Sequence, residues 1–176
     1  THVGAIVVLL AAACLVAAGV GGQGSVMHDM FIRDGMADVL KISLLVVSAV
    51  ALGFAWTFMR ERGLYKGELP ILVLFATVGM MLLVSAGNLT MVYVGLELLA
   101  LGSYALVAID RDNPLSSEAA MKYFVLGSLA SGLLLFGMSL LYGATHSLDL
   151  ATIHDLSGGL VGDDRVLMLT GVVFIV

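Results

Sequence analysis

The stretch MVYVGLELLALGSYALVAI, residues 91–109, decides the fold, because it is an almost purely apolar segment that carries one glutamate, Glu97. A membrane-spanning helix needs about 20 mainly apolar residues, which matches the length of this stretch. A carboxylate at the centre of such a helix costs roughly 3 kcal/mol or more unless it is paired, hydrated or protonated. The stretch therefore predicts a transmembrane helix, and Glu97 is its first candidate functional residue.

The whole chain has the composition of an integral membrane protein. Apolar residues make up 60% of its 176 residues, charged residues make up 12%, and the mean hydropathy is +1.08. Soluble domains carry about 25% charged residues. The net charge of −5 is scattered, without a basic patch, which argues against nucleic acid as a partner. Cys14 is the single cysteine, so an internal disulfide and a cysteine-based metal site are both excluded.

Continuous apolar runs predict an all-α, polytopic transmembrane helix bundle. We expect five complete spans, and a sixth helix of eleven residues from Val166 that is truncated. Strands are not expected, because the runs do not alternate as those of a membrane barrel would. We interpret 1–176 as a single membrane domain, the incomplete N-terminal portion of a longer subunit. The predicted spans lie near 3–21, 37–59, 69–86, 89–109 and 117–142.

Basic residues predict the orientation of the bundle. The loop at 60–68 holds three basic residues and the loop at 110–116 holds Arg111, and both lie on one side of a five-span arrangement. The loop around Arg33 and the acidic loop at 143–165 lie on the other side. Because Lys and Arg are enriched in cytoplasmic loops, we expect the first pair of loops to face the cytoplasm or an organelle matrix.

Glu97 is predicted to lie near the middle of the bilayer. It is twelve residues from Ile109, or roughly 18 Å along a helix, in a hydrocarbon core about 30 Å thick. Thr90, Tyr93 and Tyr104 share its helix face and form a partly polar stripe. Ionisable groups inside membranes are usually functional, so we interpret Glu97 as a proton-relay group. The alternative is a neutral, hydrogen-bonded acid that ties two helices together.

Lys122, on the next predicted helix, is the second candidate relay residue. Ser116 and Ser117 can cap the start of this helix, and Glu118 suits the positive end of its dipole. Lys122 lies roughly 8–10 Å into the membrane, so it either takes part in the relay or extends its ammonium to the surface. Its depth differs from that of Glu97, which favours a water-bridged link over a direct salt bridge.

The other charged residues are expected to have structural roles rather than roles in a relay. Lys41, near the outer end of the second helix, is expected to be an interface anchor. His146, His154 and the aspartates around them are expected to form a solvated loop rather than a metal site, because no ligand spacing recurs. A mid-membrane acid with a nearby lysine, and without nucleotide, haem or metal motifs, indicates a proton or ion relay. Transporter, antiporter and pump all remain open on this chemistry.

A longer segment carries a family resemblance. The segment VYVGLELLALGSYALVAIDRDNPLSSEAAMKYFVLGSLASGLLLFGMSLLYGATHSLDL, residues 92–150, resembles the subunit N family of the proton-pumping NADH-quinone oxidoreductase, respiratory complex I. The mitochondrial counterpart is NADH dehydrogenase subunit 2. The resemblance extends to about residues 30–150 and implies an antiporter-like fold with inverted repeats. It also implies that Glu97 and Lys122 are proton-relay residues.

The resemblance implies a translocase subunit without a redox centre or bound cofactor of its own. NADH, FMN, iron–sulfur clusters and quinone would belong to the complex as a whole. The expected partners are the other membrane subunits of complex I and the lipid bilayer. The expected location is the bacterial inner (plasma) membrane, with the mitochondrial inner membrane as the less favoured alternative. The alternative functions are a subunit of a multi-component sodium/proton antiporter or membrane-bound hydrogenase, and a purely structural helix bundle.

Overall fold

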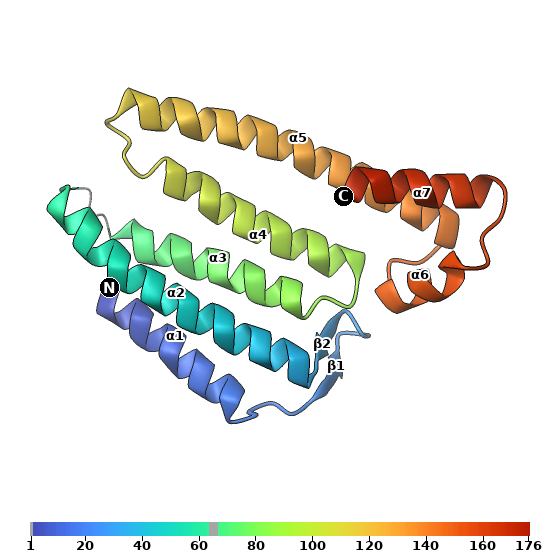
Figure 1. The fold of residues 1–176 in the computed structure, drawn as a ribbon, viewed down its shortest axis with the longest axis horizontal. Helices are drawn as coiled ribbons and strands as arrows, with labels where there is room; N and C mark the ends of the chain where they lie inside the picture. Colours follow the sequence, from blue (N-terminus) through green and yellow to red (C-terminus); the bar gives the residue numbers. More distant parts are fainter. Residues whose placement is uncertain (1, 64–66) are drawn as a thin grey trace.

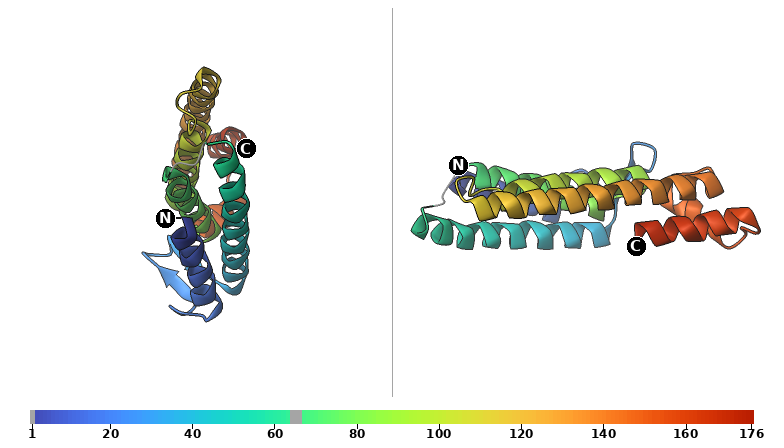
Figure 2. Two further views of the ribbon diagram at one scale, coloured as in Figure 1. Left: turned by 90° about the vertical axis from the view of Figure 1, so that its left-hand side faces the viewer. Right: turned by 90° about the horizontal axis from the view of Figure 1, so that it is seen from above.

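The computed structural model describes residues 2–63 and 67–176, which form an array of helices with one short hairpin. Helices α1 to α5 lie side by side in chain order, and α7 packs against the second half of α5 (Figure 1). Two further views show that the array is thin and that α2 and α7 lie on the same side of it (Figure 2). The elements are α1 (His2–Ala17), β1 (Gly24–Val26), β2 (Phe31–Arg33), α2 (Gly35–Glu61), α3 (Glu68–Val84), α4 (Leu89–Val107), α5 (Pro114–Thr145), α6 (Leu150–Ser157) and α7 (Asp163–Ile175).

The described helices confirm the predicted all-α membrane bundle. Helices α2, α4 and α5, with 27, 19 and 32 residues, are long and apolar enough to cross a membrane. Helices α1 and α3 are apolar but shorter. Large apolar side chains such as Phe54, Leu126 and Val173 stay exposed on the outside of the array, as suits a surface in contact with hydrocarbon.

The prediction that the chain forms no strands is wrong between α1 and α2. Strands β1 and β2 pair antiparallel, with Val26 opposite Phe31 and Gly24 opposite Arg33. The turn between them, residues 27–29, has three non-glycine residues with positive φ, a conformation that carries no glycine signal in the sequence. The segment after α3 stabilises the hairpin, because the Ile32 amide donates a hydrogen bond to the Ser85 carbonyl at 2.8 Å.

One predicted helix boundary is corrected by local capping, and one short helix is found that was not predicted. Helix α5 begins at Pro114 rather than near 117, because the Asn113 side chain accepts from the Leu115 amide and proline fits the first helical position. Part of the acidic segment, which was expected to be a solvated loop, forms helix α6. Its cap is Asp149, whose pKa is lowered because the Thr152 hydroxyl and backbone amide both donate to its carboxylate.

The loops separate into two ends of the array. The hairpin end contains β1, β2, the turn at 85–88 and the segment after α5; β-bridges join Phe31 to Ala86 and Asn88 to Asp149. The Arg111 end contains the C-terminus of α2, the N-terminus of α3 and the link between α4 and α5. This grouping agrees with the predicted loops, while Lys66 lies outside the described residues.

Lys41 is buried under the hairpin, whereas the sequence predicts an interface anchor whose ammonium reaches the membrane surface. Its residue is 4% exposed, and its ammonium lies 4.7 Å from the centroid of the Phe31 ring. Phe31 belongs to the hairpin, which covers the first turns of α2. Arg33 of the same hairpin forms a bidentate ion pair with Asp38, at 2.8 and 3.2 Å. The hairpin therefore covers the N-terminal end of α2 through an apolar ring and a charged side chain.

Candidate functional site

Glu97 lies at the centre of α4, as predicted. It is the ninth of the 19 residues of the helix and is half-buried. At the rise of an α-helix it is about 12 Å from one end of α4 and about 15 Å from the other. Within the described part of the chain, its carboxylate has neither a hydrogen bond nor an ion pair.

One face of α4 is packed against α3 through glycines. A Cβ atom built on Gly79 of α3 would lie 2.6 Å from the Leu99 amide nitrogen and 2.7 Å from the Gly95 carbonyl oxygen. On Gly102, a Cβ would lie 3.2 Å from the Leu72 carbonyl oxygen. The two helix backbones therefore approach closely, as small residues allow in membrane bundles.

Glu97 is on the opposite face of α4. Two residues along a helix rotate a side chain by about 200°, so Glu97 points away from the Gly95 face and from α3. Tyr93 and Tyr104, four residues before and seven residues after Glu97, share its direction. Tyr104 makes edge-to-face ring contacts with Tyr123, at 5.0 Å between centroids, and with Phe124, at 5.6 Å. The Glu97 face is therefore the one that α5 covers.

A groove opens between α4 and α5 on the hairpin side of Glu97. Its volume is about 400 Å³, and Tyr93, one turn from Glu97, contributes to its wall. The wall is mainly apolar but includes four hydroxyl-bearing side chains, two of them from α5. The lining residues are Leu89, Thr90, Tyr93, Leu135, Met138, Ser139, Tyr142 and Leu148. The predicted polar stripe of α4 thus gains Ser139 and Tyr142, which sequence spacing within one helix could not reveal.

Lys122 is not brought next to Glu97. Its ammonium pairs with Glu118 at 2.6 Å, one helical turn back, and the two side chains are 71% and 59% exposed. Gly127 is one of the residues of α5 that lie against Tyr104. Lys122 is five residues before it, so the two point about 140° apart around α5. The sequence already contained a signal for this ion pair, because Glu118 and Lys122 are four residues apart and side chains at that spacing are neighbours on a helix.

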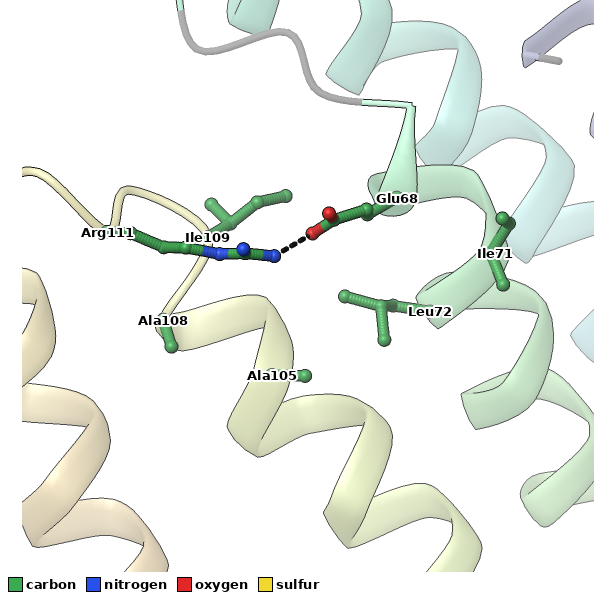
Figure 3. Close-up of a pocket in the computed structure, with 7 residues that line it drawn as sticks. All are labelled: Glu68, Ile71, Leu72, Ala105, Ala108, Ile109 and Arg111. Atoms are coloured by element: carbon green, nitrogen blue, oxygen red, sulfur yellow. Dashed lines mark hydrogen bonds and ion pairs between the residues drawn. The ribbon is translucent and has the colours of Figure 1, made fainter.

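A second hollow lies at the Arg111 end, between α3 and α4, with a volume of about 440 Å³ (Figure 3). An ion pair between Arg111 and Glu68 lies at the opening of this hollow, and both side chains are exposed. The walls are formed by Ile71, Leu72, Ala105, Ala108 and Ile109. This hollow is on the α3 side of α4, so it does not communicate with the face that carries Glu97.

Metal-ligating side chains do not gather in the parts of the chain that the structure describes. Within 2–63 and 67–176, no group of three or more His, Cys, Asp or Glu side chains lies close enough to hold an ion. The polar side chains that α4 places on the same face as Glu97 are Thr90, Tyr93 and Tyr104.

Comparison with known proteins relates this helix arrangement to respiratory enzymes. The family described as "NADH:quinone oxidoreductase/Mrp antiporter, TM" matches residues 86–176, which include Glu97 and Lys122. NADH-quinone oxidoreductase subunit N of Xanthomonas euvesicatoria pv. vesicatoria is 60% identical over 176 residues, covering 100% of this chain and 36% of the relative. The subunit N of Thiobacillus denitrificans is 51% identical over 151 residues, covering 85% of this chain and 31% of the relative.

Two solved structures share the fold. A chain of respiratory complex I from Thermus thermophilus with bound aureothin superposes with a TM-score of 0.70 and 29% identity, covering 97% of this chain and 37% of that chain. A chain of the archaeal membrane-bound sulfane sulfur reductase has a TM-score of 0.71 at 19% identity, with 99% and 37% covered, which relates the fold alone. The chain spans about a third of the length of the curated relatives it matches, at 36% and 31%. It belongs to the NADH:quinone oxidoreductase/Mrp antiporter transmembrane family.

Proposed function

We propose that this chain is part of a proton-translocating membrane subunit of an NADH-quinone oxidoreductase, in which Glu97 accepts and releases protons. The observation that carries the proposal is the position of Glu97 at the centre of α4, half-buried and unpaired among the described residues, on the face covered by α5. A structural acid that ties helices together would be hydrogen-bonded, because an unsatisfied buried polar group is costly. The absence of a fixed partner therefore favours the relay over the structural alternative.

Lys122 is proposed as a second relay group, acting through water rather than by direct contact with Glu97. Its ammonium pairs with Glu118 near the Arg111 end of α5. An exposed pair of this type exchanges its partner readily, because its net stabilisation is about 0–1 kcal/mol. Lys122 can therefore leave Glu118 and approach the relay when the electrostatics of the site change. Charge changes of this kind would couple the site to electron transfer elsewhere in the complex.

The remaining parts of the proposal concern the whole complex. We infer that this chain binds no cofactor, and that NADH, FMN, iron–sulfur clusters and quinone act in other parts of the assembly. Its partners would be other membrane subunits and lipid, in a bacterial inner membrane. The family also includes Mrp antiporters, but 60% identity to a subunit N favours the oxidoreductase. Proton uptake that depends on NADH, and not on sodium, would distinguish the two.

The test is the substitution Glu97→Gln in the full-length subunit, assembled in its complex and reconstituted in sealed vesicles. Glutamine keeps the shape of the side chain but cannot change its protonation state, so we expect at least a tenfold loss of proton uptake with the assembled complex still present on a native gel. Glu97→Asp, which keeps the carboxyl group one methylene further back, should retain part of the activity. Normal proton uptake in Glu97→Gln would leave Glu97 as a packing residue and refute the proposal.

A further inference from the structure

Tyr104 is placed on the Arg111 side of Glu97. Seven residues rotate a helix by about 700°, so the two side chains point within about 20° of one direction, and their Cα atoms lie about 10 Å apart along the axis. Both side chains lean toward the N-terminus of α4, and the longer tyrosine reaches further in that direction, toward the depth of Glu97. Both side chains belong to the face of α4 that contacts α5 through the Tyr104 ring.

The ring of Tyr104 is held in place by α5. Tyr123 and Phe124 contact it edge-to-face, at interplanar angles of 84° and 88°. The hydroxyl fits over Gly127, where a Cβ atom would overlap the Tyr104 Oη and lie 2.6 Å from its Cζ. Gly127 has ordinary helical geometry, since its φ is not in the positive region, so the lack of a side chain there provides space rather than backbone freedom. The space accommodates the phenol group.

The Tyr104 hydroxyl does not stabilise the fold through a hydrogen bond to any described residue. Among the described residues, Tyr104 Oη makes no hydrogen bond, although a phenol inside a helix interface normally finds a partner. The titratable groups on the same side are Glu97, seven residues away on its own helix, and Tyr123 of α5, whose ring contacts that of Tyr104. Lys122 is next to Tyr123 in the chain but points to another side of α5. A fixed, half-buried hydroxyl beside one mid-membrane acid is suited to proton transfer.

We propose that Tyr104 is the group through which Glu97 exchanges protons with the Arg111 end of the membrane, an inference that rests on the proposed function of Glu97. In one transfer, a water molecule between the two side chains protonates the Glu97 carboxylate and takes the phenol proton. The phenol oxygen then regains a proton from water on its Arg111 side. The hydroxyl ends as it began, and one proton has moved inward to Glu97.

The test is Tyr104→Phe in the full-length subunit within the intact complex, with Tyr123→Phe as the matched control. Phenylalanine keeps the ring contacts with α5 and removes only the hydroxyl. We expect normal assembly, a fivefold or larger loss of proton uptake, and a pH profile in which the loss grows as pH rises and free protons become scarcer. Tyr123→Phe removes a hydroxyl from the same aromatic cluster and should stay within twofold of the wild type at every pH.

Two results separate this inference from the proposed function. If Glu97→Gln abolishes proton uptake while Tyr104→Phe matches the Tyr123→Phe control, protons reach Glu97 by another route and Tyr104 is a packing residue. If both Glu97→Gln and Tyr104→Phe pump normally, the proposed function itself fails. A uniform loss of activity in Tyr104→Phe, with an unchanged pH profile, would also overturn the role in proton transfer.

Discussion

The two faces of α4 pack against their neighbouring helices through different kinds of contact. Toward α3, the glycines Gly79, Gly95 and Gly102 bring two backbones so close that a single added methyl group would meet backbone atoms. Toward α5, the contact is made by aromatic rings and hydroxyls, and it leaves a groove of about 400 Å³ beside Tyr93. Glu97 is on the second face. A backbone-to-backbone contact fixes the helix, whereas a side-chain contact leaves room for water and for changes of protonation.

The comparison explains why the acid is on one face and the glycines are on the other. A carboxyl group that changes its charge needs space and polar neighbours, and neither exists where the α3 and α4 backbones touch. The closely packed α3–α4 pair positions Glu97 along the helix axis, and on the proposed function the α5 side would supply the groups that exchange protons with it. The predictions below test whether the two faces are as distinct in function as they are in packing.

Among changes to the packing and charges around α4, the largest effect on assembly is expected on the glycine face. Gly79→Ala places a Cβ 2.6 Å from the Leu99 amide nitrogen, and a backbone atom cannot move aside as a flexible side chain would. Overpacking of this kind costs about 1–3 kcal/mol. We expect severalfold less assembled complex on a native gel. The matched control is Gly132→Ala, on an open side of α5 with no heavy atom within 4 Å, which should assemble normally. Equal assembly of both variants would show that the α3–α4 contact is not tight.

An intermediate effect is expected at Lys122. Lys122→Ala removes the proposed relay ammonium and should lower proton uptake severalfold, while Lys122→Arg keeps the charge and part of the activity. Glu118→Gln is the control, because it removes the ion pair but leaves the lysine. If the pair only stabilises the start of α5, Lys122→Ala and Glu118→Gln will behave alike, with near-normal uptake, and Lys122 is then a surface residue.

The smallest effect is expected at the Arg111 end, on the glycine face. The ion pair of Arg111 with Glu68 is exposed, so breaking it should cost less than about 1 kcal/mol. A double-mutant cycle of Glu68→Gln and Arg111→Gln on the thermal stability of the purified complex measures the coupling directly. High salt should reduce the coupling further. A coupling well above 1 kcal/mol would mean that this pair, rather than the glycines, fixes α3 against α4.

Local patterns in the sequence predicted most of the membrane helices and the central acid. The apolar run of 91–109 was enough to place Glu97 at mid-helix, and helical spacing was enough to align Tyr93 and Tyr104 with it. Residues of other helices could not be placed in this way. Ser139 and Tyr142 reach the groove, and Gly127 receives the Tyr104 hydroxyl, only because α5 crosses α4 at a particular rotation.

The predictions failed where distant segments meet. Strands β1 and β2 have three residues each, and the hairpin is secured by Ser85, more than fifty residues later in the chain. The burial of Lys41 depends on Phe31 of that hairpin, so its environment could not be read from α2 alone. The start of α5 was an error of local interpretation, because Asn113 followed by Pro114 is itself a helix-start signal that outranks the serines.

Infrared difference spectroscopy of the intact complex, between resting and NADH-driven states, reports directly on whether Glu97 changes its protonation state. The wild type should show a protonated-carboxyl band that rises or falls with turnover, and Glu97→Gln should lack that band while keeping the other spectral changes of the complex. Glu97→Asp should retain it at a shifted position. Identical carboxyl spectra in the wild type and Glu97→Gln would contradict the account, because a group that keeps one protonation state throughout turnover relays no protons.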